Sequence, residues 1–522
     1  MGLMKGADPS RFCSLFFLEV MMIARYLGRD GFLKSNNLWS LFLVFYFSSS
    51  ALASVKDGVD AYSQQSYEQA FSIFKDEAAK GDATANYYMG LQYEEGNGVS
   101  KDPVKAFGFM SEAANHGIAK AQYKLGVFYE EGFGVPVDLS KSAQYYKAAA
   151  EQGLPAAQFN YALMLRDGLG VKKDEASAII FMQRAANSGD AEALNGLGVA
   201  YILGRGVRRD AVKGVQFLKL AAEKGDPGAQ RNLAKSFSDG TGVEKDERKA
   251  FEWYKKSAEK NDKVAQLALG QAYEYGVGVE QDYANALVWY KRSASSDYAP
   301  AQYKIGYFYN VGKGVAPDFE KARYWFGLSA DHGLAIAQTD LASLLESGQG
   351  GSIDNAAAAK WYRLAAAQNM PRAQYQLAVM LKEGRGVERD YAEAILYFRA
   401  LAAEKVSYAE NELGNMYRHG YGVSQDYSAA IEWYWKAANQ NDDAAFANLS
   451  LVYQKGLGVP QNLVVSYALL KCALSIKPGG EAYKKALNLT LRGLSDKQSM
   501  EGEKLSPQIC REKSVAVSNY LK

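Results

Sequence analysis

Hydrophobic positions recur in two helical stripes per period of 36 residues, and short polar segments separate the stripes. Within residues 120–155, Ala121, Leu125, Phe128 and Tyr129 follow one another at steps of four, three and one. Such steps place side chains on one face of an α-helix. A second apolar stripe follows each loop, and in most periods it carries an adjacent pair of aromatic residues. The pattern predicts two antiparallel helices per period, and neither can bury its apolar face without a neighbouring period.

In every period, a glycine and an Asp or Asn stand at fixed positions that mark helix ends. Loop glycines recur every 36 residues without insertion or deletion, at Gly96, Gly132, Gly168, Gly204, Gly240, Gly276, Gly312, Gly348, Gly384, Gly420 and Gly456. Glycine ends helices well because it adopts left-handed backbone angles without a Cβ penalty. Asp, or Asn in the last period, stands six positions after each loop glycine, and both residue types cap helix starts. We therefore predict that the first helix stops at the loop glycine and the second helix starts at the Asp.

A small-residue position lies six positions before each loop glycine. It holds only Gly, Ala or Ser in every period. A glycine inside a helix costs about 1 kcal/mol relative to alanine, so its recurrence needs a reason. We predict that a neighbouring helix approaches closely at this position.

These residues resemble the sel-1-like repeat (SLR) family of the tetratricopeptide-like superfamily. The family pattern is A-x-x-x-L-G-x-x-Y-x-x-G-x-G-V-x-x-D, followed by an aromatic pair and an Ala-Ala step, and the segment AQLALGQAYEYGVGVEQDYANALVWYKRSASSD at 265–297 matches nearly every position. The resemblance implies an all-α fold, a right-handed α-solenoid of about eleven helix-turn-helix repeats with terminal caps. We expect a degenerate tetratricopeptide-like cap over 54–82, eleven SLR units over 83–478, and a C-terminal helical cap with a frayed tail over 479–522.

The N-terminal segment 1–53 has the pattern of a secretory signal peptide. The apolar run Leu38–Phe47 follows the basic residues Arg25, Arg29 and Lys34, and an A-x-A site ends at Ala53. We expect cleavage after Ala53 and a periplasmic or secreted protein. An uncleaved anchor is the alternative, although the run is much shorter than the roughly 20 residues needed to span a bilayer. No later segment could cross a membrane.

Charge and composition narrow the classes of partner and chemistry. Removing the segment 1–53 takes five basic and three acidic side chains from totals of 60 and 58, leaving 55 of each. A neutral chain has no basic footprint for nucleic acid. No Walker loop, nucleophile elbow or zinc motif is present, so we predict no enzyme, cofactor or metal site. His116 and His332 share one turn position, where a polar turn residue suffices.

Two cysteines remain after signal cleavage, Cys472 and Cys510. They could form a disulfide in an oxidising compartment. The alternative is two separate thiols, with Cys472 as a small core residue.

The resemblance implies a scaffold that binds one or more partner proteins on the concave face, which the first helices line in tetratricopeptide-like stacks. Positions 12, 8, 5 and 1 before each loop glycine share one side of the first helix, here called the first-helix face. Tyrosine is a favoured interface anchor, and apolar residues on a solvated face suggest a partner site. The apolar candidates on this face are Val199, Leu203, Val264, Tyr275, Tyr307, Val311 and Ile336.

Three other interpretations stay open at this point. The helix face could be rotated, so that these apolar residues pack between repeats. The protein could be an adaptor of protein quality control in the endoplasmic reticulum lumen, although no anchor or retention tail supports this. A β-lactamase-like hydrolase is a third class, because cysteine-rich SLR relatives have been discussed as such enzymes, but the sequence lacks their cysteine framework.

Overall fold

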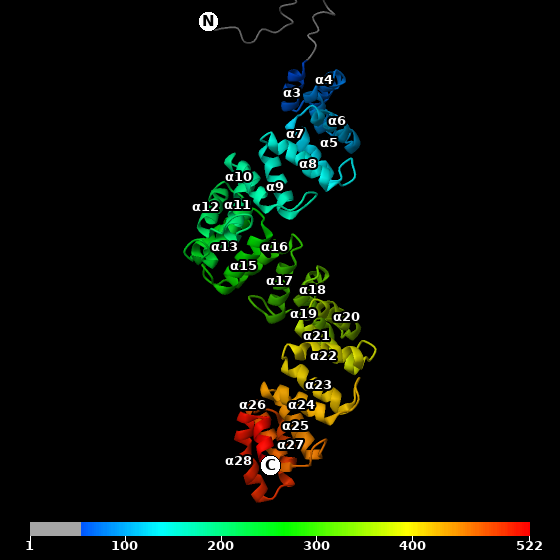
Figure 1. The fold of residues 1–522 in the computed structure, drawn as a ribbon, viewed down its shortest axis with the longest axis vertical. Helices are drawn as coiled ribbons and strands as arrows, with labels where there is room; N and C mark the ends of the chain where they lie inside the picture. The colour runs from blue at the N-terminus through cyan, green and yellow to red at the C-terminus, as the bar shows by residue number, and fades with distance from the viewer. Residues whose placement is uncertain (1–53, 522) are drawn as a thin grey trace, which may run out of the picture. The chain divides into compact units, whose positions relative to one another are not determined.

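The computed structural model describes residues 54–521, and every regular element in that range is a helix. The predicted signal peptide lies outside the described residues. Within the described range, twenty-seven helices, α3 to α29, follow one another in the chain (Figure 1). They divide into two compact units, one ending at Arg209 and the other beginning at Asp210. The predicted all-α repeat architecture is confirmed.

Each repeat period contains two helices, a first and a second. The first helices are α5 (Ala83–Glu95), α7 (Ala119–Glu131), α9 (Pro155–Asp167), α11 (Ala191–Leu203), α13 (Pro227–Asp239), α15 (Lys263–Tyr275), α17 (Ala299–Val311), α19 (Ala335–Ser347), α21 (Pro371–Glu383), α23 (Ser407–His419) and α25 (Asp443–Lys455). The second helices are α6 (Pro103–Asn115), α8 (Leu139–Glu151), α10 (Glu175–Asn187), α12 (Ala211–Glu223), α14 (Glu247–Glu259), α16 (Tyr283–Ala294), α18 (Phe319–Asp331), α20 (Asn355–Ala367), α22 (Tyr391–Ala403), α24 (Tyr427–Asn439) and α26 (Leu463–Ile476).

The helix ends lie where the sequence predicts them. All of the loop glycines have positive φ, as at Gly276 with φ 68°. The Asp or Asn six positions later is the N-cap of every second helix, and its side chain accepts a hydrogen bond from the third residue of that helix. In the α15–α16 repeat the Asn285 amide donates to Asp282 at 2.9 Å. These local bonds make every repeat turn at the same place.

The second glycine of each G-x-G loop joins successive repeats. Gly278 has a φ of 72°, and a Cβ there would lie 2.1 Å from the carbonyl oxygen of Glu247, the first residue of α14. The loop backbone therefore rests on the start of the preceding second helix, and only glycine fits there.

In five repeats the small-residue position holds a glycine that faces a large side chain of the second helix in the same repeat: Gly90, Gly126, Gly270, Gly306 and Gly414. A Cβ on Gly126 would lie 2.5 Å from the ring of Tyr146, and one on Gly270 would lie 2.5 Å from the ring of Tyr290. Both rings are almost completely buried. The predicted close approach is confirmed, and what approaches is a side chain.

Terminal helices close both ends of the array. At the N-terminal end, α3 (Val55–Ser63) and α4 (Tyr67–Ala79) form a pair that packs against α5. At the C-terminal end lie α27 (Glu481–Arg492), α28 (Asp496–Glu512) and α29 (Ser514–Leu521). The sequence predicts a frayed tail, but α29 is a helix whose Ala516 and Val517 are buried in the same apolar cluster as α26 and α28.

Candidate protein-binding surface

The structure leaves all seven apolar candidates at least partly exposed. Val199 and Leu203 lie on α11 in the first unit, and the other five lie on α15, α17 and α19 in the second. Tyr275 is the most exposed of the second-unit set, at 57%, whereas Val199 and Tyr307 are only half-buried. Tyr307 also packs against the apolar clusters of two neighbouring regions. None of the seven is a fully buried core residue.

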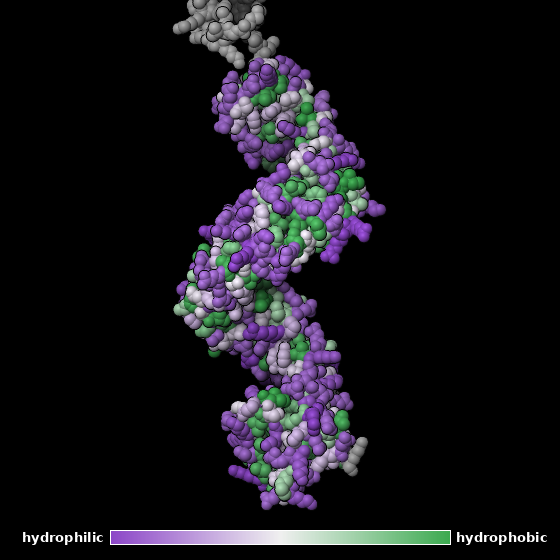
Figure 2. Space-filling model, turned by 90° about the vertical axis from the view of Figure 1, so that its left-hand side faces the viewer, coloured by the Kyte–Doolittle hydropathy of each residue, from purple (hydrophilic) through white to green (hydrophobic). Residues whose placement is uncertain are grey.

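Exposed apolar residues are not confined to the first-helix face. Val288 on α16 and Leu396 on α22 are 47% and 63% exposed, and both lie on second helices. The space-filling view likewise shows hydrophobic residues scattered among hydrophilic ones on its visible side (Figure 2). Exposure of apolar side chains alone therefore does not single out a binding surface.

A buried carboxylate with two lysines distinguishes the first-helix face around Tyr275. The Glu274 side chain is 1% exposed, and the ammonium groups of Lys304 and Lys313 lie 3.1 and 3.0 Å from its two oxygens. The hydroxyl of the buried Tyr290 donates to the same carboxylate at 2.5 Å. This set joins three consecutive elements of the second unit: α15, α16, and α17 with its following loop.

The two tyrosine candidates of this region contact the same lysine, Lys304. Lys304 donates to the Tyr275 hydroxyl at 3.1 Å, and its ammonium lies 5.3 Å from the Tyr275 ring centre and 6.0 Å from that of Tyr307. Lys313 lies 5.3 Å from the Tyr275 ring centre. Cation–π contacts of this kind contribute about 0.5–1 kcal/mol at exposed sites. The structure thus brings Tyr275 and Tyr307 together around Lys304.

Electrostatics keep this cluster charged and positive overall. Burial raises the pKa of Glu274, but hydrogen bonds from Tyr290, Lys313 and Lys304 outweigh it and leave that pKa below the ordinary value. Burial lowers the pKa of Lys304 and of Lys313, but their hydrogen bonds to Glu274, and for Lys304 also to Tyr275, leave both pKa values raised. Two ammonium groups therefore share one carboxylate, and one positive charge is in excess beside Tyr275.

Related ion pairs connect the first helices of other successive repeats. They join the second position before one loop glycine to the eighth position before the next: Glu94 to Lys124 at 2.8 Å and, with the charges reversed, Lys382 to Glu412 at 2.8 Å. No sequence motif singles out Glu274, Lys304 or Lys313. These pairs could be found in the sequence as opposite charges at matching positions of successive repeats. Recognising them requires knowing how one repeat is placed against the next.

The two cysteines are bonded. Cys472 on α26 and Cys510 on α28 form a disulfide with a Cα–Cα distance of 5.3 Å, 38 residues apart in the chain. Cys472 is fully buried and Cys510 packs against the same cluster. Of the two alternatives that the sequence leaves open, the structure has the paired one.

Within residues 54–521, no group of three or more His, Cys, Asp or Glu side chains is placed to hold a metal ion. His332 follows α18 and contacts the side chain of Gln302 at 3.1 Å, a structural role in a turn. Over the same range, none of the helices combines the length and the apolar character that crossing a bilayer requires.

Comparisons with known proteins agree with this architecture. The Sel1 repeat family matches residues 83–118, 119–154, 155–190, 191–226, 227–262, 263–298, 299–334, 335–370, 371–405, 407–442 and 445–475. The chain is 34% identical to a protective antigen present in uropathogenic Escherichia coli strains, whose crystal structure displays an SLR fold; the match covers 86% of this chain and 96% of the other, with a TM-score of 0.63. A Sel1 repeat protein from Oxalobacter formigenes is 30% identical over 59% of this chain and 90% of its own, with a TM-score of 0.49. None of the curated proteins matches the chain by sequence.

Proposed function

Because the chain belongs to the Sel1 repeat family, we propose that it is an exported scaffold that binds a partner protein on the first-helix face around Tyr275. Sel1 repeat proteins are generally non-catalytic scaffolds, and the comparisons indicate no enzyme family. Stacked repeats expose long surfaces suited to macromolecular partners.

The observation that carries the proposal is the ordered, half-exposed aromatic and cationic cluster on α15 and α17. Tyr275 is 57% exposed, yet Lys304 and Lys313 hold its ring and hydroxyl. A rigid aromatic ring loses little conformational entropy on binding, which is why tyrosine anchors many interfaces. The excess positive charge favours a partner surface that carries carboxylates.

Export is supported by the sequence of the segment 1–53 and by the start of α3. Ser54 is the N-cap of α3, and its backbone nitrogen lies 2.7 Å from the Asp57 carboxylate. Cleavage after Ala53 would turn that nitrogen into an ammonium group, which would keep the Asp57 carboxylate as its hydrogen-bond partner. The similarity to a bacterial protective antigen also supports a location outside the cytosol.

Partner binding is tested with two matched pairs of substitutions. Tyr275→Ser with Val311→Ser alters the first-helix face, and Val288→Ser with Leu396→Ser alters equally exposed positions on second helices. We expect the first pair to reduce the amount of partner captured from periplasmic or secreted proteins, as quantified by mass spectrometry, and the second pair to leave it unchanged. Equal capture by both pairs at unchanged melting temperatures would place the partner elsewhere.

Export is tested separately by N-terminal sequencing of the protein recovered from the periplasm or medium. We expect the mature chain to begin at Ser54. An intact Met1 on protein found only in the cytosol would contradict the proposal.

A further inference from the structure

In one repeat, a core position between successive helix pairs carries a side chain that is too small to fill the space. Four positions before each loop glycine, the first helix inserts a side chain against the second helix of the preceding repeat. Every described repeat except one buries this residue: Gln92, Phe128, Met164, Ala200, Ser236, Phe308, Leu344, Met380, Met416 and Val452. The exception is Ala272 on α15, which is only half-buried.

The residue that this position should cover, Tyr254, is only partly buried. It occupies the second position of the aromatic pair in the preceding second helix, where Tyr146, Tyr290, Tyr362 and their counterparts in the other repeats are 3% exposed or less. Phe308 covers Tyr290 edge-on, with the ring centres 5.4 Å apart. The corresponding pair one repeat earlier is Tyr254 and Ala272, and there Tyr254 is only half-buried. Alanine is too short to cover the ring.

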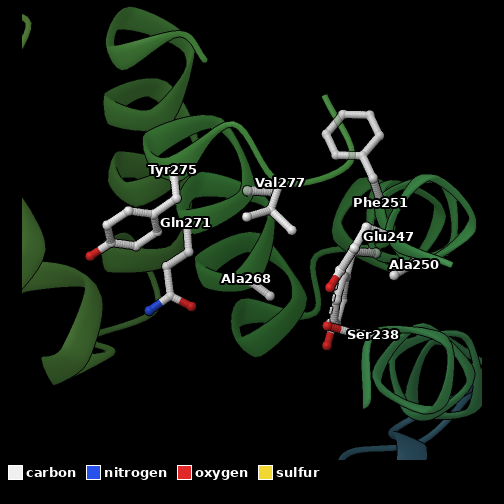
Figure 3. Close-up of a pocket in the computed structure, with 10 residues that line it drawn as sticks. Ser238, Glu247, Ala250, Phe251, Ala268, Gln271, Tyr275 and Val277 are labelled. Atoms are coloured by element: carbon white, nitrogen blue, oxygen red, sulfur yellow. Dashed lines mark hydrogen bonds between the residues drawn. The ribbon is translucent and has the colours of Figure 1, made fainter. Parts of the chain in front are cut away.

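A pocket of 180 Å³ lies where that side chain is missing. Tyr254, Ala250 and Phe251 of α14 line one side, and Ala268 and Ala272 of α15 line the other. Figure 3 shows the residues of α15 facing those of α14 across it. A cavity of about 150 Å³ holds one benzene ring, whereas small-molecule sites usually need about 300 Å³ or more. The pocket therefore has room for a single side chain.

The chemistry of the rim differs on the two sides of the pocket. On the α14 side, Glu247 forms an ion pair with Lys245 at 2.9 Å and accepts a hydrogen bond from the Ser238 hydroxyl at 3.2 Å. On the α15 side, Tyr275 lines the pocket and also accepts a hydrogen bond from Lys304, where the excess positive charge lies. A carboxylate next to the inserted side chain would meet that charge.

We propose that this pocket receives one Leu, Met or Phe side chain of a partner protein, from a segment in which an Asp or Glu stands beside it. The apolar side chain takes the place that Phe308 or Met380 takes in sister repeats, and the carboxylate lies toward Lys304 and Lys313. The inference rests on the proposed function, because it specifies what the first-helix face recognises.

The test is a selection of random displayed peptides on the purified protein and on an Ala272→Met variant. Methionine fills the same position at Met380, so the variant should keep or raise the melting temperature. We expect wild-type selections to enrich an apolar residue next to Asp or Glu. We expect the selected peptides to bind the variant about tenfold more weakly or worse, because burying such a side chain is worth at least a factor of ten.

Three further variants sharpen the result. Val288→Met adds the same side chain at an exposed position on α16 and should leave binding unchanged. Ala272→Val fills less of the pocket, and valine occurs at the equivalent position Val452. This variant should weaken binding partially, and it replaces Ala272→Met if methionine is too large for the site. Lys313→Gln should remove the preference for acidic residues and keep that for apolar ones.

The outcomes separate this inference from the proposed function. Peptides that bind the protein and its filled variants equally would overturn the pocket and leave the scaffold function standing. An absence of any enriched peptide would count against both. A change from dimer to monomer in Ala272→Met, measured by sedimentation, would mean that a second copy of the chain fills the pocket, and would also overturn the proposal.

Discussion

Replacing Glu274 by glutamine should destabilise the α15–α17 region without changing its shape. Glutamine keeps an oxygen that can accept from Tyr290, but it leaves Lys304 and Lys313 without their shared negative charge. Their side chains are only 17% and 22% exposed, so water replaces the lost carboxylate incompletely. Removing one partner lowers stability most when the ion pair is close and buried, because the remaining charge is left without compensation.

The size of the loss follows from the distances and the partial exposure. At an effective dielectric constant of about 20, each pair at the observed separation is worth about 5 kcal/mol before solvation is counted. The two pairs together come to about 10 kcal/mol. Hydration of the partly exposed lysines, together with the desolvation cost that a neutral glutamine avoids, offsets about three quarters of this. We expect a net loss of about 2–3 kcal/mol, slightly below the roughly 3–5 kcal/mol typical of fully buried pairs.

The same substitution has a pH signature with a definite sign. The folded protein holds the pKa of Glu274 below its ordinary value of 4.5, so its contribution to stability is fully present above about pH 4.5. It is lost as the pH falls through the lowered folded-state pKa, because the protonated carboxyl then resembles glutamine. The difference between wild type and Glu274→Gln should therefore be largest near pH 7 and shrink in acid.

Hydrogen exchange measured by mass spectrometry over α15, α16 and α17 reports the loss of local stability in Glu274→Gln. A local measure is needed because a chain with two compact units need not unfold in one step. Glu280→Gln, at an exposed position in the following loop, is the matched control and should leave protection unchanged. Equal protection in Glu274→Gln and wild type at pH 7, or a difference that persists unchanged at pH 3, would refute the reasoning.

Three further predictions concern the repeat itself and its C-terminal end. Asp282→Ala removes the acceptor for the Asn285 amide and should lower the denaturation midpoint, whereas Asp282→Asn should nearly restore it because Asn462 caps the last repeat; an unchanged midpoint in the alanine variant would show that this cap is dispensable. Gly126→Val should cost about 1–3 kcal/mol by overpacking, because its Cβ would meet the buried Tyr146 ring at 2.5 Å, and an equal cost for Val at the exposed Gly108 would argue against this cause. Cys510→Ser opens a loop of 38 residues, which corresponds to about 4 kcal/mol in a chain-entropy estimate; exchange should accelerate in α28 and α29 but not in α5, and an unaffected C-terminal end would contradict it.

The local features of the fold could be predicted because each depends on a few neighbouring residues. A helix end at Gly276 and a helix start at Asp282 need only the conformational freedom of glycine and one side-chain acceptor. The close approach at the small-residue position is also predictable from the sequence, because only small residues occur there. The side chain that approaches it is not. That side chain is Tyr290 opposite Gly270, and its identity depends on how the two helices of one repeat are rotated against each other.

Features between repeats were harder to predict, since they depend on the register of one helix pair on the next. Glu274 contacts two lysines of the following repeat, and no property of Glu274 alone distinguishes it from the many exposed acidic residues. Arg323 shows the same dependence: its guanidinium donates to the Ser352 carbonyl at 3.2 Å and fills the space beside Gly351, where other repeats carry valine.

The pocket over Tyr254 follows from the same register, and it shows how a periodic sequence can encode a local site. A single alanine at position 272 is unremarkable in a helix, and Ala200 and Ser236 occupy the same position in the two preceding repeats. Those two stay buried, opposite the smaller side chains of Met182 and Leu218. Among the repeats that the structure describes, only Tyr254 is a large ring opposite an alanine. A repeat array therefore creates a distinctive surface through the mismatch of two positions on successive helices, while each position by itself conforms to the family pattern.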